Sequence, residues 1–201
     1  EGVHLLAESI KAYRAALELV SLESLPREWA ITQINLGNAL QDQGKRAGGN
    51  EWVHLLGEAI EAYRLALTIF TSELFPDKWA TAQNNLGNAL QLKANLADSE
   101  EDTSLLEDAV QAFHVALEVR TRESLPQDWA TTKNNLGFAL QKQGIRAGGI
   151  EGIRLLEEAG EAYRAALEVR TQEALPYQHQ QTTKNLNKAL KQLEELKARD
   201  S

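Results

Sequence analysis

The segment "QNNLGNALQ", residues 83–91, decides the fold because it recurs along the chain. It returns as "QINLGNALQ" at 33–41, as "KNNLGFALQ" at 133–141 and, in altered form, as "TKNLNKALK" at 183–191. A fixed period of this kind is typical of repeat proteins, in which each unit is one supersecondary structure that stacks on its neighbours. We therefore divide the chain into four units, residues 1–50, 51–100, 101–150 and 151–201.

The same period governs residues outside this segment. Prolines and tryptophans repeat at it, as Pro26, Pro76, Pro126 and Pro176 and as Trp29, Trp79 and Trp129. No linker, low-complexity stretch or block of like charge separates the units. Residues 1–201 are therefore predicted to form a single array.

Each unit is predicted to contain two helices. In the first unit Leu6, Ile10 and Tyr13 begin an apolar stripe with helical spacing, which predicts a helix over about residues 3–22, the B helix. A second helix, the A helix, begins at Pro26, because proline fits the first helical position.

The glycine pairs at 48–49 and 148–149 are expected to end A helices, since glycine readily takes a positive φ. Eight helices of roughly 18–22 residues in antiparallel pairs are expected, with no strand. The predicted fold class is all-α, a right-handed superhelical solenoid.

Composition excludes several classes of function. The chain has no cysteine and a net charge of −8, which argues against a nucleic-acid or anionic-membrane binder and suits a cytoplasmic protein. No apolar run approaches the ~18 residues of a membrane span. The chain begins with Glu1 and contains no methionine, so we interpret it as a fragment of a longer protein.

Two weak helix formers stand inside the recurring segment. Glycine costs about 1 kcal/mol against alanine in a helix, and asparagine roughly half as much. Gly37, Gly87 and Gly137 lie at the edge of the leucine face, so they are expected to let the B helix approach closely. Asparagine needs a different explanation, because its side chain is polar.

Asn35, Asn85, Asn135 and Asn185 hold one position in all four units. An amide both donates and accepts, so these side chains could bind the main chain of an extended ligand. They could equally bond the backbone of a neighbouring repeat and fix the superhelix pitch. Both interpretations stay open from the sequence.

The candidate ligand-binding residues form an amide-rich strip on the A helices, with a basic stripe on the last one. The stripe is either a solvated cap or a site for the acidic end of a ligand. The predicted residues are Asn35, Asn84, Asn85, Asn88, Asn134, Asn135, Phe138, Asn185, Lys184, Lys188 and Lys191.

The pattern resembles the tetratricopeptide repeat. The family's run of W-x-x-L-G-x-x-Y followed by G, A, F and P is partly met by Leu136–Gly137, Gly144, Ala159, Tyr163, Ala166 and Pro176. The family's first tryptophan and its tyrosine are Lys133 and Leu140 here, and the unit has 50 residues rather than about 34. The chain resembles the long-repeat arrays of bacterial multidomain proteins, which often precede a caspase-like CHAT protease or an NTPase module.

The resemblance implies that the A helices line a concave groove. In related O-linked N-acetylglucosamine transferases an asparagine ladder on that helix grips the backbone of an extended peptide, and Asn35, Asn85, Asn135 and Asn185 match the ladder position. The expected function is therefore a non-catalytic scaffold that binds protein or an extended peptide.

The alternative function is homotypic assembly through the ends or faces of the array. Leu5 and Leu6 would face a missing helix, so weak self-association through residues Val3 to Val20 is expected. No nucleophile–base pair, cofactor motif or metal site is expected. His4 and His54 recur with the repeat, but one histidine per layer cannot assemble a metal site.

Overall fold

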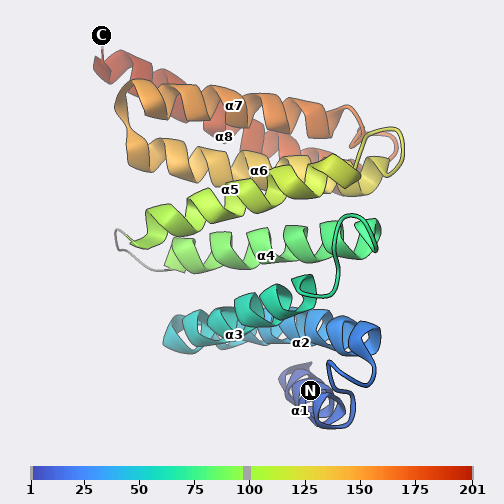
Figure 1. The fold of residues 1–201 in the computed structure, drawn as a ribbon. Coiled ribbons are helices and arrows are strands. Elements are labelled where there is room, and N and C mark those ends of the chain that lie inside the picture. The colour runs from blue at the N-terminus through green and yellow to red at the C-terminus, as the bar shows by residue number, and fades with distance from the viewer. Residues whose placement is uncertain (1, 97–100, 201) are drawn as a thin grey trace. The chain divides into compact units, whose positions relative to one another are not determined.

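Residues 2–96 and 101–200 are described by the structure, a computed structural model, and in these ranges they form eight α-helices and no strand. This confirms the predicted all-α class for the described part of the chain. The helices are α1 (Gly2–Leu19), α2 (Pro26–Ala47), α3 (Gly49–Leu67), α4 (Pro76–Leu96), α5 (Glu101–Val119), α6 (Pro126–Ala147), α7 (Gly149–Leu167) and α8 (Pro176–Asp200) (Figure 1).

Proline and glycine set the helix ends where the sequence predicts them. The four repeated prolines are the first residues of the A-type helices α2, α4, α6 and α8, whereas α1, α3, α5 and α7 are B-type. Gly48 and Gly49 have φ values of +74° and +55°, a backbone that other residues rarely adopt. They let α2 turn directly into α3, and Gly148 and Gly149 join α6 to α7 in the same way. The prediction for α1 was too long, since this helix ends at Leu19.

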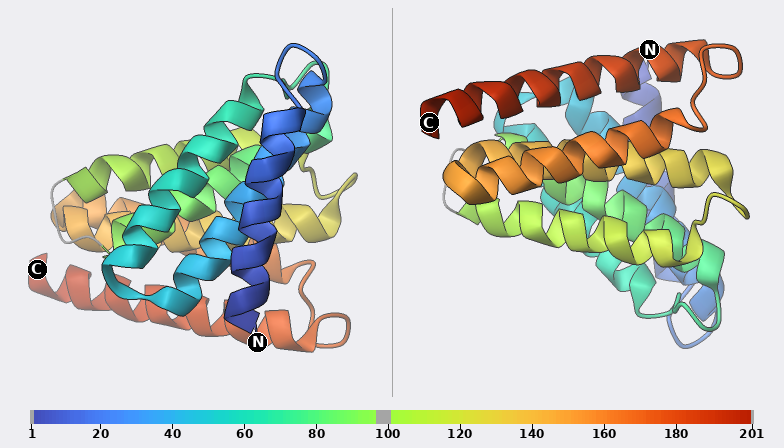
Figure 2. Two further views of the ribbon diagram at one scale, coloured as in Figure 1. Left: turned by 90° about the horizontal axis from the view of Figure 1, so that it is seen from below. Right: turned by 90° about the horizontal axis from the view of Figure 1, so that it is seen from above.

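The chain divides into two compact units, residues 1–105 and 106–201, which we call the N-terminal and the C-terminal unit. In the N-terminal unit α1 packs on α2, α2 on α3 and α3 on α4; in the C-terminal unit α6 packs on α7 and α7 on α8. Figure 2 shows the α2–α3 and α6–α7 hairpins from two further directions. Consecutive helices therefore bury each other, as a helical repeat requires.

The glycines of the recurring segment lie where two helices touch. A Cβ atom added to Gly37 would stand 2.7 Å from the ring of Tyr63 on α3, and one on Gly137 would stand 3.0 Å from Tyr163 on α7. Both tyrosines are completely buried. The expectation that glycine permits close packing of an A helix on a B helix is confirmed at these two positions.

Candidate functional site

The predicted site residues lie on A-type helices and fall into two groups. In the N-terminal unit the group comprises Asn35 on α2 and Asn84, Asn85 and Asn88 on α4. In the C-terminal unit it comprises Asn134, Asn135 and Phe138 on α6 with Lys184, Asn185, Lys188 and Lys191 on α8. Each unit thus carries a candidate face formed by two A-type helices, α2 and α4 or α6 and α8.

In the N-terminal unit a buried tyrosine begins a network of amides. The hydroxyl of Tyr63 on α3 donates to Asn38 Oδ1 on α2 over 2.8 Å, and Asn85 Nδ2 on α4 donates to the same oxygen over 3.0 Å. Burial, and secondarily the charge of Asp42, raise the pKa of Tyr63 far above its usual value. Asn38 therefore connects three helices through one acceptor atom.

The other amides of this face differ in exposure. Asn84 is buried and donates to Asn85 Oδ1 over 3.3 Å, so it supports its neighbour. Asn35 and Asn88 are partly exposed, as is Asn85. Asn38, which the sequence analysis did not single out, is more exposed than these three, so a ligand can reach four amides of this face.

In the C-terminal unit the corresponding network begins at an arginine. Arg170, only 9% exposed, donates to Thr182 Oγ1 and to Thr131 Oγ1, each over 3.0 Å. Thr182 in turn donates to Asn134 Oδ1 over 3.2 Å, and Asn185 Nδ2 donates to that oxygen over 3.4 Å. Burial lowers the pKa of Arg170. The guanidinium thereby links α6 to α8 from beneath the candidate face.

Two ladder residues therefore bond a neighbouring A-type helix. Asn85 contacts Asn38, and Asn185 contacts Asn134. The second interpretation of the ladder expected bonds of this kind, but it expected them to reach backbone rather than another amide side chain. The ligand-binding interpretation stays a prediction, since these side chains also have exposed surface.

An aromatic ring and several cations meet on the candidate face of the C-terminal unit. Lys142 Nζ lies 5.5 Å from the ring centroid of Phe138, and both residues are partly exposed. Burial is the main cause that lowers the pKa of Lys142, and the positive charges of Lys188 and Arg146 lower it further. Positive charges on α6 and α8 thus act on Lys142 together. Further along α8, Lys191 pairs with Glu195.

Sequence reasoning missed the buried arginines. Arg120 is 6% exposed and donates to Thr132 Oγ1 over 3.0 Å, in the same arrangement as Arg170 with Thr182. The available signal was a covariation within the repeat. Arginine occurs at position 20 of a unit only where threonine stands at position 32, whereas Phe70 is matched with Ala82.

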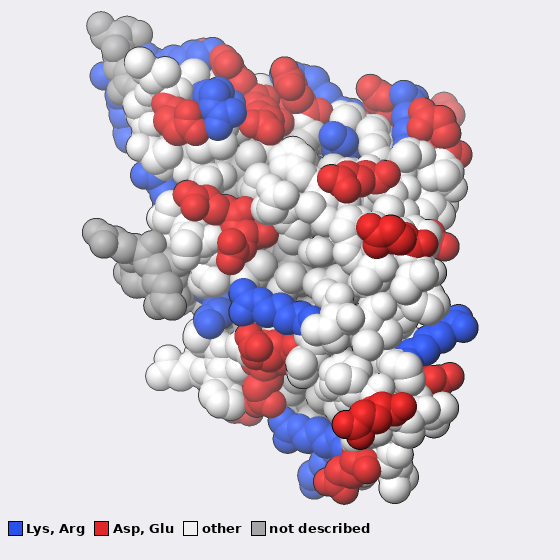
Figure 3. All heavy atoms as spheres, viewed as in Figure 1, with Lys and Arg blue, Asp and Glu red and all other residues white. Residues whose placement is uncertain are grey.

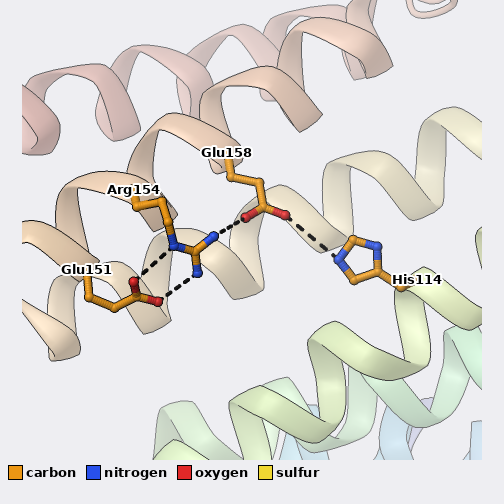
Figure 4. A network of polar contacts seen from close by, with 4 residues as sticks. All are labelled: His114, Glu151, Arg154 and Glu158. Carbon is orange, nitrogen blue, oxygen red and sulfur yellow. Dashed lines mark hydrogen bonds and ion pairs between the residues drawn. The ribbon is translucent and has the colours of Figure 1, made fainter.

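The most crowded charged cluster lies on B-type helices and carries no sign of chemistry. Arg154 binds Glu151 through two nitrogens and Glu158 through a third, and His114 lies 3.9 Å from Glu158 (Figure 4). The bond from Arg154 lowers the pKa of Glu151. The two pairs of Arg154 lie within α7 and are solvent-exposed, so they contribute little to stability, and only the contact of His114 with Glu158 joins α5 to α7.

Acidic and basic side chains are interspersed on the face of the molecule that Figure 3 draws. Among the described residues no group of three or more histidine, cysteine, aspartate or glutamate side chains could hold a metal ion. Nor do the described helices include one with the length and apolar character of a membrane span.

Compared with models of known protein families and with curated proteins, the sequence matches none.

Proposed function

We propose that this protein is a non-catalytic scaffold that binds an extended peptide along the face of its A-type helices. The observation that carries the proposal is the partly exposed pair of Phe138 and Lys142 on α6, in which Lys142 Nζ lies 5.5 Å from the ring centroid and the charge of Lys188 on α8 opposes that of Lys142. The right-handed superhelical form and the tetratricopeptide membership that the sequence pattern suggests are part of the same proposal, as is a cytoplasmic location.

The charge on this face selects the ligand. Lys142 and Lys188 repel each other, so a carboxylate bound between them would relieve that repulsion and gain two charge-assisted contacts. The partly exposed Phe138 ring offers apolar surface beside the same spot. The expected ligand is therefore a peptide with acidic residues next to an apolar one.

The amides then hold the main chain of the peptide. Asn135 and Asn185 are both partly exposed, and they occupy the same position on successive A-type helices. A-type helices spaced by roughly 8–10 Å would present one amide to about every third residue of an extended strand. Contacts of this kind tolerate many sequences, which leaves selectivity to the lysines.

Fluorescence anisotropy tests the proposal with a defined probe. The probe is a fluorescein-labelled peptide of alternating glutamate and alanine, about twelve residues long or ~40 Å when extended. We expect it to bind the full chain at least about tenfold more tightly than a peptide of alternating lysine and alanine. The double variant Lys142→Gln, Lys188→Gln should lose at least about tenfold in affinity, since each charged contact contributes about 1.5–3 kcal/mol.

The matched control removes two other exposed cations. Lys11 and Arg164 lie on the B-type helices α1 and α7, so Lys11→Gln, Arg164→Gln should leave the affinity for the acidic probe within about twofold. If both double variants lose affinity equally, general charge attraction explains the binding and the proposed site is rejected.

A further inference from the structure

Helix α1 exposes a face that the B-type helices α3 and α7 bury. Leu5 is 63% exposed, whereas its counterparts Leu55 and Leu155 are 8% and 4% exposed. The same contrast holds one helical turn after another. Four further side chains of α1 are exposed or half-exposed, namely Leu6, Ala12, Tyr13 and Ala16. The residues at the same positions of α3 and α7 are all buried.

The structure shows what covers this face elsewhere. In each hairpin an A-type helix lies on it and presents a glycine to the buried tyrosine, Gly37 to Tyr63 and Gly137 to Tyr163. A second glycine follows seven residues later. Gly44 meets Trp52 in the N-terminal unit, and a Cβ on Gly144 would stand 2.9 Å from the carbonyl oxygen of Gly152 in the C-terminal unit. The covering helix is thus defined by a leucine face with two glycines seven residues apart.

Helix α1 retains the side chains that receive such a helix. Tyr13 stands at the position of Tyr63, and Leu5, Ala12 and Ala16 repeat the leucine and alanine positions of α3. We propose that α1 is a docking surface for an A-type helix from outside the described residues, one that carries the leucine–glycine pattern of α2 and α6. The site lies on the opposite end of the sequence from the cationic face and is independent of it.

A second copy of the chain does not offer such a helix. In α8 the two glycine positions are occupied by Asn187 and Glu194, whose side chains would enter space that a single Cβ already overfills at Gly37. The glycine faces of α2 and α6 are already covered by α3 and α7, and Gly87 of α4 is buried. The occupant must therefore bring its own glycine face.

A synthetic peptide with the sequence of residues 26–47 serves as the probe. Labelled with fluorescein and added to the full chain, it should bind saturably, with weak affinity because an isolated helix of this length is marginal in water. Hydrogen exchange should slow in α1 over residues 5–19 when the peptide is present, and should stay unchanged in α8.

The control peptide carries Gly37→Asn and Gly44→Glu, the residues of α8 at those positions. We expect its affinity to fall at least about tenfold, although asparagine and glutamate are no worse helix formers than glycine. On the chain, Leu5→Lys with Ala12→Glu should abolish binding of the original peptide. Leu74→Lys, at another exposed leucine, should leave the binding unchanged.

Three results would overturn the proposal: no saturable binding of the original peptide, equal binding of the two peptides, or protection outside α1. Sedimentation that shows a dimer of the chain, lost in Leu5→Lys with Ala12→Glu, would make a second copy the occupant and would also reject it. Circular dichroism confirms that each variant keeps its helices, which is expected because the substituted side chains are exposed.

Discussion

The two units solve the same packing problem with opposite chemistry. At position 20 of the repeat, just beyond a B-type helix, the N-terminal unit places Phe70, which is completely buried and packs edge-to-face on Phe75 with ring centroids 5.3 Å apart. The C-terminal unit places Arg170 there, nearly as buried, with its guanidinium bonded to Thr182 and Thr131. Phe70 and Arg170 are thus both buried at the same repeat position although one is apolar and the other charged.

The difference teaches how the repeat tolerates a buried charge. Each arginine bonds a threonine twelve residues later, whereas the residue twelve positions after Phe70 is Ala82, which is also buried. A buried cation is costly unless its hydrogen bonds are satisfied, so the hydroxyl must accompany the arginine. The two members of the pair are expected to change together.

The largest expected effect on stability comes from combining the arginine of the C-terminal unit with the alanine of the N-terminal unit. Phe70→Arg places a guanidinium opposite Ala82, where no hydroxyl receives it, and should cost about 3–5 kcal/mol in the free energy of unfolding. Adding Ala82→Thr should recover about 1.5–3 kcal/mol, the contribution of a hydrogen bond to a charged group. Urea denaturation measures both changes.

The matched control for this rescue is Ala82→Val, which has the shape of threonine without its hydroxyl. On the Phe70→Arg background it should give no recovery. If valine restores stability as well as threonine does, added volume rather than the hydrogen bond explains the pairing of arginine with threonine.

The second glycine of each hairpin, Gly44 or Gly144, is expected to differ less between the two units in its effect on stability. A Cβ on Gly144 meets the backbone oxygen of Gly152 at 2.9 Å, whereas one on Gly44 meets the Trp52 side chain, which is partly exposed and can rotate. We expect Gly144→Ala to cost about 1–3 kcal/mol. At Gly44 the gain in helix propensity of about 1 kcal/mol offsets most of the clash. Equal melting temperatures for the two variants would contradict this comparison.

The buried tyrosines predict a loss of stability in alkali. Burial raises the pKa of both Tyr63 and Tyr163 above the value of about 10 that tyrosine has in an unfolded chain. Above that pH the unfolded state releases protons that the folded state retains, so stability should fall by up to about 1.4 kcal/mol per pH unit for each tyrosine. Below pH 10 neither tyrosine should affect the pH dependence of the free energy of unfolding.

Replacing both tyrosines with phenylalanine should weaken the dependence of the urea midpoint on pH between about pH 9 and 11. Asp42→Asn sharpens the comparison between the units. The charge of Asp42 raises the pKa of Tyr63, whereas the same repeat position near Tyr163 holds Lys142. This substitution should therefore lessen the alkaline loss that Tyr63 causes and leave the part caused by Tyr163 unchanged.

The smallest expected effect distinguishes the two roles of the asparagine ladder. Asn85 bonds Asn38, whereas Asn35 lies on α2, which no A-type helix precedes in the described chain. Asn85→Ala should lose a hydrogen bond of about 0.5–1.5 kcal/mol, partly offset by better helix propensity. Asn35→Ala should melt slightly higher than the unchanged protein, by that propensity alone. If Asn85→Ala melts as high as Asn35→Ala, the bond between helices has no structural value and ligand binding becomes the better explanation.

The periodic residues made most of the helices predictable from sequence. Proline at the first helical position and the paired glycines depend only on local backbone preference, so α2 and α6 begin and end where the sequence predicts. The apolar stripes identified the faces that α3 and α7 bury, because burial of apolar side chains is the dominant driving force, whereas on α1 only Ile10 of the named stripe is buried. The end of α1 was harder to predict, since no proline or glycine marks it.

The polar contacts were far less predictable. An amide can pair with backbone, side chain or ligand, and its sequence position does not choose among them, so the bond from Asn85 to Asn38 was not foreseen. Arginine is usually exposed, so the residue type gives no sign that Arg120 and Arg170 are buried. Their burial depends on a threonine twelve positions later on another helix, which becomes evident only when the units are aligned with each other.

The residues at the glycine positions of α8 also bear on how the protein behaves at high concentration. A surface that fits the opposite end of its own kind generates an open filament, because each added copy presents a fresh end. Asn187 and Glu194 remove that fit from α8, whereas Leu5 stays exposed on α1. Within the described residues, two polar side chains thus prevent the α8 face of one copy from stacking on the α1 face of another.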